Sequence, residues 1–214
     1  MADRKELVIV GFSGFGREVY LLATRLGIKI RGFLDDNVDN HGKTYGNTVV
    51  LSSVDRWTDY SDCEFVVAIG NPRVRKRVIE AMEVRGRPSY ATLIDPAAIV
   101  HAEHVRIGNG SVICAGTICT VDIEIGDHVI VNINCTVGHD TVIGDFSTVA
   151  PIVAISGNVS IEERVEVGTG ASIRQGISIG AGSMLGMGSV LTKSMPAQTV
   201  YFGSPAKLIK NISE

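Results

Sequence analysis

Five histidines in this 214-residue chain could exchange a proton near neutral pH: His41, His101, His104, His128 and His139. Asp140 follows His139 directly, and a carboxylate beside an imidazole favours its protonated form and so raises its basicity. The pair could serve as a general base that takes a proton from an amine or hydroxyl. Adjacent residues on a strand point apart, so Asp140 can serve His139 only if a corner turns both outward. Otherwise His139 is a solvated turn residue.

Other kinds of reactive site lack the necessary spacing. No cluster of His, Cys and carboxylate has metal-ligand spacing, and no Ser-His-Asp arrangement can be proposed. The four cysteines form no C-x-x-C pair, and three of them fall inside the apolar repeats described next. We therefore expect no metal, no covalent intermediate on the protein and a reducing, cytoplasmic location.

Half of the chain repeats with a period of six residues. An aliphatic residue, replaced once by cysteine, recurs at every sixth position from Ile107 to Leu191, and a small or β-branched residue lies four positions after each of them up to Leu185. A period of six fits neither a helix nor a simple alternating strand, but it suits short parallel strands joined by tight corners into a solenoid. A β-sandwich is the alternative of another architecture, and it would not hold one register for so many repeats.

The first part of the chain has a different pattern. Apolar runs predict strands at residues 7–12, 28–34, 65–69 and 90–94, and helical patterning covers residues 16–26 and 73–85. Alternating strands and helices favour a small, mostly parallel sheet of Rossmann type. The change of period near Asp95-Pro96 predicts one domain over residues 1–96 and a second over residues 97–214.

A glycine-rich turn, Gly11 to Gly16, joins the first predicted strand to the first helix, where a phosphate could bind the helix N-terminus. Ser13 occupies the second glycine position of a dinucleotide-binding motif, and the pair Asp35-Asp36 follows about twenty residues later, as an acidic ribose ligand would. An NAD-dependent enzyme would need more sheet than this segment offers. The alternative interpretation is a purely structural turn, in which the aspartates cap a strand.

Composition limits the partners. Lys and Arg number 20 against 23 Asp and Glu, which argues against broad binding to nucleic acid, and no segment has the length and apolar character of a membrane span.

Together, these features resemble a known family. The glycine turn, Phe33-Leu34-Asp35-Asp36, Ala68-Ile69-Gly70-Asn71, the hexapeptide solenoid and the terminal Gly203-Ser204-Pro205-Ala206-Lys207 are similar to the bacterial sugar acyltransferases that include the bacillosamine-pathway acetyltransferase and the sialic acid O-acetyltransferases. The resemblance implies a Rossmann-like domain followed by a left-handed parallel β-helix. It also implies acetyl-CoA as cosubstrate and a homotrimer with active sites between neighbouring β-helices.

The same resemblance assigns site residues. It gives His139 the role of base with Asp140 as its partner, and Gly157, eighteen residues later, a backbone N–H for the developing oxyanion. It implies that the sugar contacts Ser13, Gly14, Phe15, Asp35, Asp36, Gly70 and Asn132, with Phe15 standing where the family commonly has histidine. Thr148, Thr169 and Met187 match positions that line the coenzyme. Candidate cations for its phosphates are Arg174, Lys193, Lys207 and Lys210.

Two functions of different class stay open at this point. The first is an acetyltransferase acting on the amino group of a nucleotide-linked 4-amino-deoxy sugar in surface polysaccharide or glycan synthesis, with sialic acid O-acetylation as its variant. The second is a non-catalytic binding solenoid, a role that other hexapeptide proteins illustrate. The ending at Gly203 to Lys207 favours the enzyme.

Overall fold

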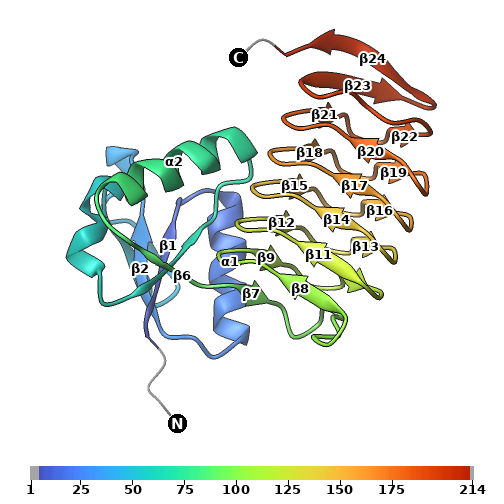
Figure 1. The fold of residues 1–214 in the computed structure, drawn as a ribbon. Coiled ribbons are helices and arrows are strands. Elements are labelled where there is room, and N and C mark those ends of the chain that lie inside the picture. The colour runs from blue at the N-terminus through green and yellow to red at the C-terminus, as the bar shows by residue number, and fades with distance from the viewer. Residues whose placement is uncertain (1–4, 213–214) are drawn as a thin grey trace. The chain divides into compact units, whose positions relative to one another are not determined.

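The structure is a computed structural model that describes residues 5–212, and it divides into two compact units. The first unit extends to Leu93, and the second begins at Ile94 (Figure 1). The sequence placed this boundary at residue 96.

The first unit is built on a six-stranded sheet with the strand order β3-β4-β2-β1-β5-β6. Its strands are β1 Leu7–Val10, β2 Ile30–Leu34, β3 Thr44–Tyr45, β4 Thr48–Ser52, β5 Glu64–Val67 and β6 Ser89–Tyr90. All neighbours pair in parallel except β3 and β4, which form an antiparallel hairpin. This arrangement confirms the Rossmann-like architecture.

Each of the two helices of this unit begins after a residue whose side chain caps the first turn. Helix α1 (Gly14–Arg25) starts after Ser13, whose hydroxyl accepts a hydrogen bond from the Gly16 N–H. Helix α2 (Pro72–Val84) starts after Asn71, whose side chain accepts from two N–H groups of the first turn. Two short 3-10 helices, η1 (Val38–Asn40) and η2 (Val54–Tyr60), complete the unit.

One expected strand is divided in two. The sequence predicted a single strand over residues 90–94, but the structure has β6, which pairs with β5, and a separate β7 (Leu93–Ile94), which belongs to the largest sheet of the β-helix. The Ala91 N–H still bonds to Phe65, whereas the Asp95 N–H bonds to Ile113. A continuous apolar pattern does not reveal this change of hydrogen-bonding partner.

The second unit is a prism with three sheets, which we name after strands of one coil. The β15 face contains β7, β9 Val112–Ile113, β12 Ile130–Val131, β15 Thr148–Val149, β18 Glu166–Val167, β21 Met184–Leu185, β23 Thr199–Gly203 and β24 Ala206–Asn211. The β13 face contains β10 Ile118–Cys119, β13 Thr136–Val137, β16 Ala154–Ile155, β19 Ser172–Ile173 and β22 Val190–Leu191. The β14 face contains β8 Val105–Ile107, β11 Ile123–Ile125, β14 Val142–Ile143, β17 Ser160–Ile161 and β20 Ser178–Ile179.

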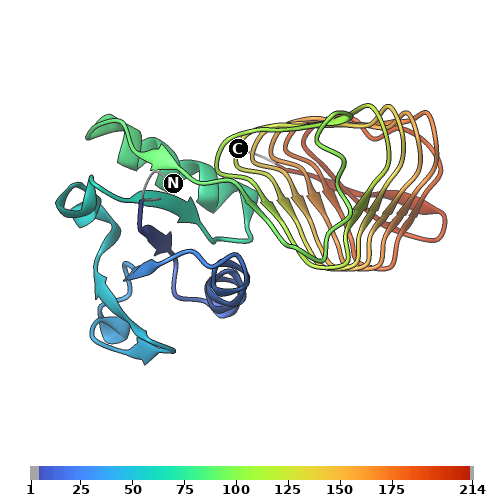
Figure 2. The same ribbon diagram turned by 90° about the horizontal axis from the view of Figure 1, so that it is seen from below.

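From β8 to β22 the coils stack in register, so paired residues are eighteen positions apart. Val137 pairs with Ile155, which pairs with Ile173, which pairs with Leu191. These aliphatic residues point into the prism and are at most 3% exposed. Each coil repeats the outline of the one before (Figure 2). The expected left-handed parallel β-helix is thereby confirmed.

Corners are made by residues in the left-handed backbone region. Such a residue occurs at every sixth position from Gly110 to Gly188, and it includes Asp140 with φ of 57° and Asn158 with φ of 54°. Because the period of these corners equals that of the aliphatic residues, each corner separates one two- or three-residue strand from the next.

Candidate active site

His139 and Asp140 lie together at one edge of the prism. We call this edge the histidine corner; it consists of the turns between the β13 and β14 faces, at residues 120–122, 138–140, 156–158, 174–176 and 192–194. The positive φ of Asp140 turns both side chains outward, and His139 Nδ1 lies 2.7 Å from Asp140 Oδ2. Their side chains are 51% and 61% exposed, so the ring is open to a ligand. The corner thus provides the geometry that a simple strand would not.

Gly157 lies directly against the imidazole in the next coil. A Cβ atom placed on Gly157 would be 2.4 Å from His139 Nε2 and 2.5 Å from Cε1. A Cβ on Gly138 would similarly meet the Gly157 nitrogen at 2.5 Å. Both positions therefore need glycine for close approach, and Gly138 is a requirement that the sequence did not indicate.

The Gly157 N–H is available to a ligand. Its neighbours Ser156 and Asn158 donate to Ile173 and His139, but Gly157 donates to no acceptor within the described residues. A free N–H beside an imidazole can stabilise negative charge on the carbonyl oxygen of a ligand. Histidine, carboxylate and free amide form the elements of a proton-transfer site with an oxyanion donor.

Three of the expected ligand residues lie at a different edge. Asn132, Thr169 and Met187 belong to the turns between the β15 and β13 faces, at residues 132–134, 150–152, 168–170 and 186–188, which we call the asparagine corner. In a single chain the whole β13 face separates this edge from the histidine corner. Thr148 lies on β15 and is 8% exposed, whereas Met187 is 69% exposed. One chain therefore does not bring these residues to His139.

A cavity of about 380 Å³ in the first unit gathers most of the expected sugar-binding residues. It is lined by Gly11, Ser13, Asp35, Asp36, Asn37, Val54, Ile69, Gly70, Val74 and Val78. Gly14 and Phe15 are the first two residues of α1 and are not part of this lining. The cavity lies where β1, β2 and β5 end, as a ligand site in a Rossmann-like sheet does.

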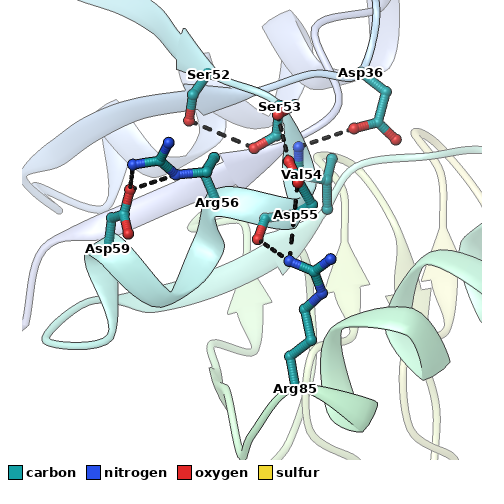
Figure 3. Close-up of polar contacts among 8 residues, drawn as sticks. All are labelled: Asp36, Ser52, Ser53, Val54, Asp55, Arg56, Asp59 and Arg85. Carbon is teal, nitrogen blue, oxygen red and sulfur yellow. Dashed lines mark hydrogen bonds and ion pairs between the residues drawn. The ribbon is translucent and has the colours of Figure 1, made fainter.

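Both aspartates of this cavity already bind the backbone. Asp35 accepts from the Phe12 N–H at 2.7 Å and from the Asn37 N–H at 3.0 Å, and the Asp36 carboxylate accepts from the Val54 N–H at 2.9 Å (Figure 3). Asp35 thus holds the glycine turn in place, which is the structural role that the sequence left open. This role does not prevent the remaining lone pairs from meeting a ligand.

A second cavity of about 430 Å³, between η2 and α2, adjoins the first and shares Asp36, Val54, Val74 and Val78 with it. Arg85 lies in its lining and donates to the Asp55 carbonyl at 2.8 Å (Figure 3). The sequence did not predict this cavity. The spacing of Val74, Val78 and Ala81 on one side of α2 is the signal that could have indicated it.

Buried Arg75 is another residue that the sequence did not single out. It is 1% exposed, and it donates to the carbonyl oxygens of Ile69 at 2.5 Å and Gly70 at 3.1 Å. It therefore fixes the loop that places Gly70 in the first cavity.

The remaining histidines and cysteines have other surroundings. His41 Nε2 contacts the Asp35 carbonyl at 2.8 Å, and His104 lies 3.5 Å from Asp122. Burial raises the pKa of Cys119 to about 11, so this thiol stays protonated and is a poor nucleophile. Within residues 5–212 there is no group of three or more metal-ligating side chains and no helix long and apolar enough to cross a membrane.

Comparisons with known proteins agree with both units. Residues 6–82 match the PglD N-terminal domain, and residues 158–193 match the hexapeptide repeat of succinyl-transferase. GDP-perosamine N-acetyltransferase of Escherichia coli O157:H7 is 36% identical over 125 residues, which are 58% of this chain and only 55% of that protein. The chain thus aligns with about half the length of this curated relative.

Solved structures match over nearly the whole chain. The acetyltransferase domain of PglB from Neisseria gonorrhoeae FA1090, in complex with acetyl coenzyme A, is 32% identical with a TM-score of 0.89, over 97% of this chain and 100% of that one. A histidine-to-asparagine mutant of perosamine N-acetyltransferase from Caulobacter crescentus, in complex with CoA and GDP-perosamine, is 28% identical with a TM-score of 0.89, over 96% and 97%.

The fold and these matches define a hexapeptide-repeat acyltransferase with a Rossmann-like N-terminal domain. The matches to the PglD N-terminal domain and to the PglB acetyltransferase domain specify the group more closely. The chain belongs to the family of bacterial sugar acyltransferases.

Proposed function

We propose that this protein transfers the acetyl group of acetyl-CoA to the amino group of a nucleotide-linked 4-amino-deoxy sugar. The observation that carries the proposal is the histidine corner, where Asp140 holds Nδ1 of His139 and Gly157 lies beside Nε2. Two relatives named for the N-acetylation of perosamine support an amino acceptor.

His139 acts as the general base in direct attack. With Asp140 accepting a hydrogen bond from the proton that stays on Nδ1, the lone pair on Nε2 is free to take a proton from the attacking amine. The amine nitrogen bonds to the thioester carbonyl carbon, and the Gly157 N–H stabilises the oxyanion that forms. Collapse of this intermediate breaks the C–S bond, and the proton on His139 passes to the departing sulfur.

The first unit holds the acceptor. Ser13, Asp35, Asp36 and Gly70 meet in one cavity at the carboxyl ends of the strands, where the N-terminus of α1 favours a phosphate. Gly14 and Phe15 take part through this helix start.

A homotrimer completes the site. Because the β13 face separates His139 from Thr169 and Met187 in one chain, we propose that the asparagine corner of a neighbouring copy supplies the coenzyme contacts. Small exposed residues on the β13 face, Thr136, Ala154 and Ser172, allow a close approach. The four free thiols fit a cytoplasmic enzyme.

The test is acetyl-CoA consumption, followed with a thiol reagent, across UDP-, dTDP- and GDP-linked 4-amino sugars and across free and CMP-linked sialic acid. Turnover with one amino-sugar nucleotide, and its loss in His139→Ala, is expected. Turnover with sialic acids alone would mean that the protein is an O-acetyltransferase and not an N-acetyltransferase. Activity that survives the substitution would contradict the role of His139, and coenzyme binding without any turnover would indicate a binding solenoid.

A further inference from the structure

Charge is distributed very unevenly along the β-helix. Residues 94–166 contain ten carboxylates and only two basic residues, Arg106 and Arg164. Residues 167–212 contain four basic residues and no carboxylate: Arg174, Lys193, Lys207 and Lys210. The coils up to β18 are therefore strongly acidic, and the coils beyond it are basic.

The two ends also differ in whether their cations are neutralised. In the acidic coils, Arg106 pairs with Glu124, and Arg164 lies 2.9 Å from Glu163. In the basic coils, the side chains of Arg174 and Lys193 are exposed, and neither forms an ion pair with any described residue. Uncompensated charges on an exposed surface are available to an anionic ligand.

Two of these cations lie on the same edge as His139. Arg174 occupies the position of Gly138 two coils later, because it follows Ile173 as Gly138 follows Val137. The backbone hydrogen bonds agree with this placement: the Arg174 N–H bonds to Leu191 as the Gly138 N–H bonds to Ile155. Lys193 follows Leu191 by two residues, as His139 follows Val137, in the corner of the third coil. Figure 1 shows β13, β16, β19 and β22 stacked in this order.

Spacing along this edge fits the coenzyme. Adjacent coils lie about 4.8 Å apart, which places the corners of Arg174 and Lys193 about 10 and 14 Å beyond that of His139. An extended pantetheine arm, with its two amides, separates a thioester from the diphosphate by a distance on the order of 15 Å. Between the histidine and Lys193 the same position of each corner holds the uncharged residues Gly157 and Gln175.

We propose that Arg174 and Lys193 form a cation ladder that binds the diphosphate of coenzyme A and directs the thioester to His139. This inference rests on the proposed function. The acidic coils exclude the phosphates from the opposite direction, so charge fixes which way the coenzyme lies along the histidine corner. Lys207 and Lys210 lie on β24 at the end of the β15 face and are not members of the ladder.

The test measures equilibrium binding by calorimetry, without acceptor, for three probes: CoA, 3′-dephospho-CoA, which keeps the diphosphate, and pantetheine, which has no phosphate. For the double variant Arg174→Ala/Lys193→Ala at low salt, we expect binding of both CoA and dephospho-CoA to weaken roughly tenfold, a factor that corresponds to about 1.4 kcal/mol. Pantetheine binding should not change, and added salt should remove most of the difference for CoA.

Matched controls are Arg106→Ala at the acidic end and Lys207→Ala/Lys210→Ala on β24, and both should bind CoA as the wild type does. The ladder would be refuted if the double variant bound CoA normally, if pantetheine weakened equally, or if the β24 variant carried the effect. A wild-type protein that bound neither CoA nor pantetheine would instead overturn the proposed function itself.

Discussion

Gly157 lies so close to the His139 imidazole that a single methyl group would displace the ring. A Cβ at this position would stand 2.4 Å from Nε2, and the atom it meets belongs to an exposed side chain that can move away. We therefore expect Gly157→Ala to lower kcat about 100-fold, the usual cost of misplacing a reacting group by about 1 Å. The measurement is steady-state kinetics together with thermal unfolding.

A matched control is Ser160→Ala, an exposed position on β17 in the same coil. It should leave both kcat and the melting temperature unchanged. If Gly157→Ala unfolded the protein, the glycine would be needed for folding and not specifically for the position of His139. If the variant kept full activity, the close packing of Gly157 against His139 would not be needed for catalysis.

Asp140 provides a second prediction at this scale, because its carboxylate lies 2.7 Å from Nδ1. An asparagine can hold the same position without the charge that favours the imidazolium formed during proton transfer. We expect Asp140→Asn to lower kcat roughly 10- to 100-fold, a moderate loss because solvent partly screens the exposed pair. The KM for acetyl-CoA should stay within about twofold of the wild-type value. An unchanged kcat would show that the carboxylate only orders the turn.

Only part of the site at this scale is encoded in a readable pattern. The six-residue repeat, with three repeats in each coil, implies that residue 157 stacks on residue 139, and the structure places Gly157 there. The approach of Asp140 to His139 depends on a φ of 57°. An aspartate tolerates this backbone conformation, but its presence in the sequence does not predict it. The burial of Arg75 depends on which of several basic residues of α2 faces inward.

At the scale of elements, the corners determine the shape of the prism. Gly176 occupies the left-handed position of its turn with φ of 74°, and no atom lies within 4 Å of a Cβ placed there. A substitution at this position therefore tests backbone conformation alone. We expect Gly176→Val to destabilise the fold by about 1–2 kcal/mol, while Gly176→Asn should cost much less, as the native Asn158 does in the preceding coil.

The measurement is the melting temperature, for which 1 kcal/mol corresponds to about 2–4 °C in a chain of this size. Equal losses in the two variants would mean that the loss of glycine itself, rather than the branched side chain in a left-handed turn, sets the cost.

Element boundaries show why the first unit was harder to predict than the second. In the β-helix the repeating aliphatic residues point inward and pair with residues eighteen positions away, so the period alone defines the strands. Where the first unit ends, the apolar run at residues 90–94 overlaps two short strands that belong to different sheets. Local pattern reports that a segment is buried, but it does not report which strand is its partner.

For the whole molecule, the separation of the two corners is the reason why we propose a site shared between copies. If the site joins the histidine corner of one copy to the asparagine corner of the next, then His139→Ala and Met187→Arg damage opposite sides of each interface. A homotrimer of either variant contains no intact site. A mixed trimer contains one, formed by the histidine of a Met187→Arg chain and the unaltered asparagine corner of a His139→Ala chain.

Random assembly of the two variants in equal amounts should therefore restore about a quarter of the wild-type sites, because three in four trimers are mixed and each has one intact site in three. The measurement is activity after joint refolding, with size and composition determined by light scattering and native mass spectrometry. The control is the same mixture combined after separate refolding, in which no exchange occurs and no activity should return. A jointly refolded mixture that forms mixed trimers yet stays inactive would place the coenzyme and the base within one chain, and it would remove the reason for the trimer in catalysis.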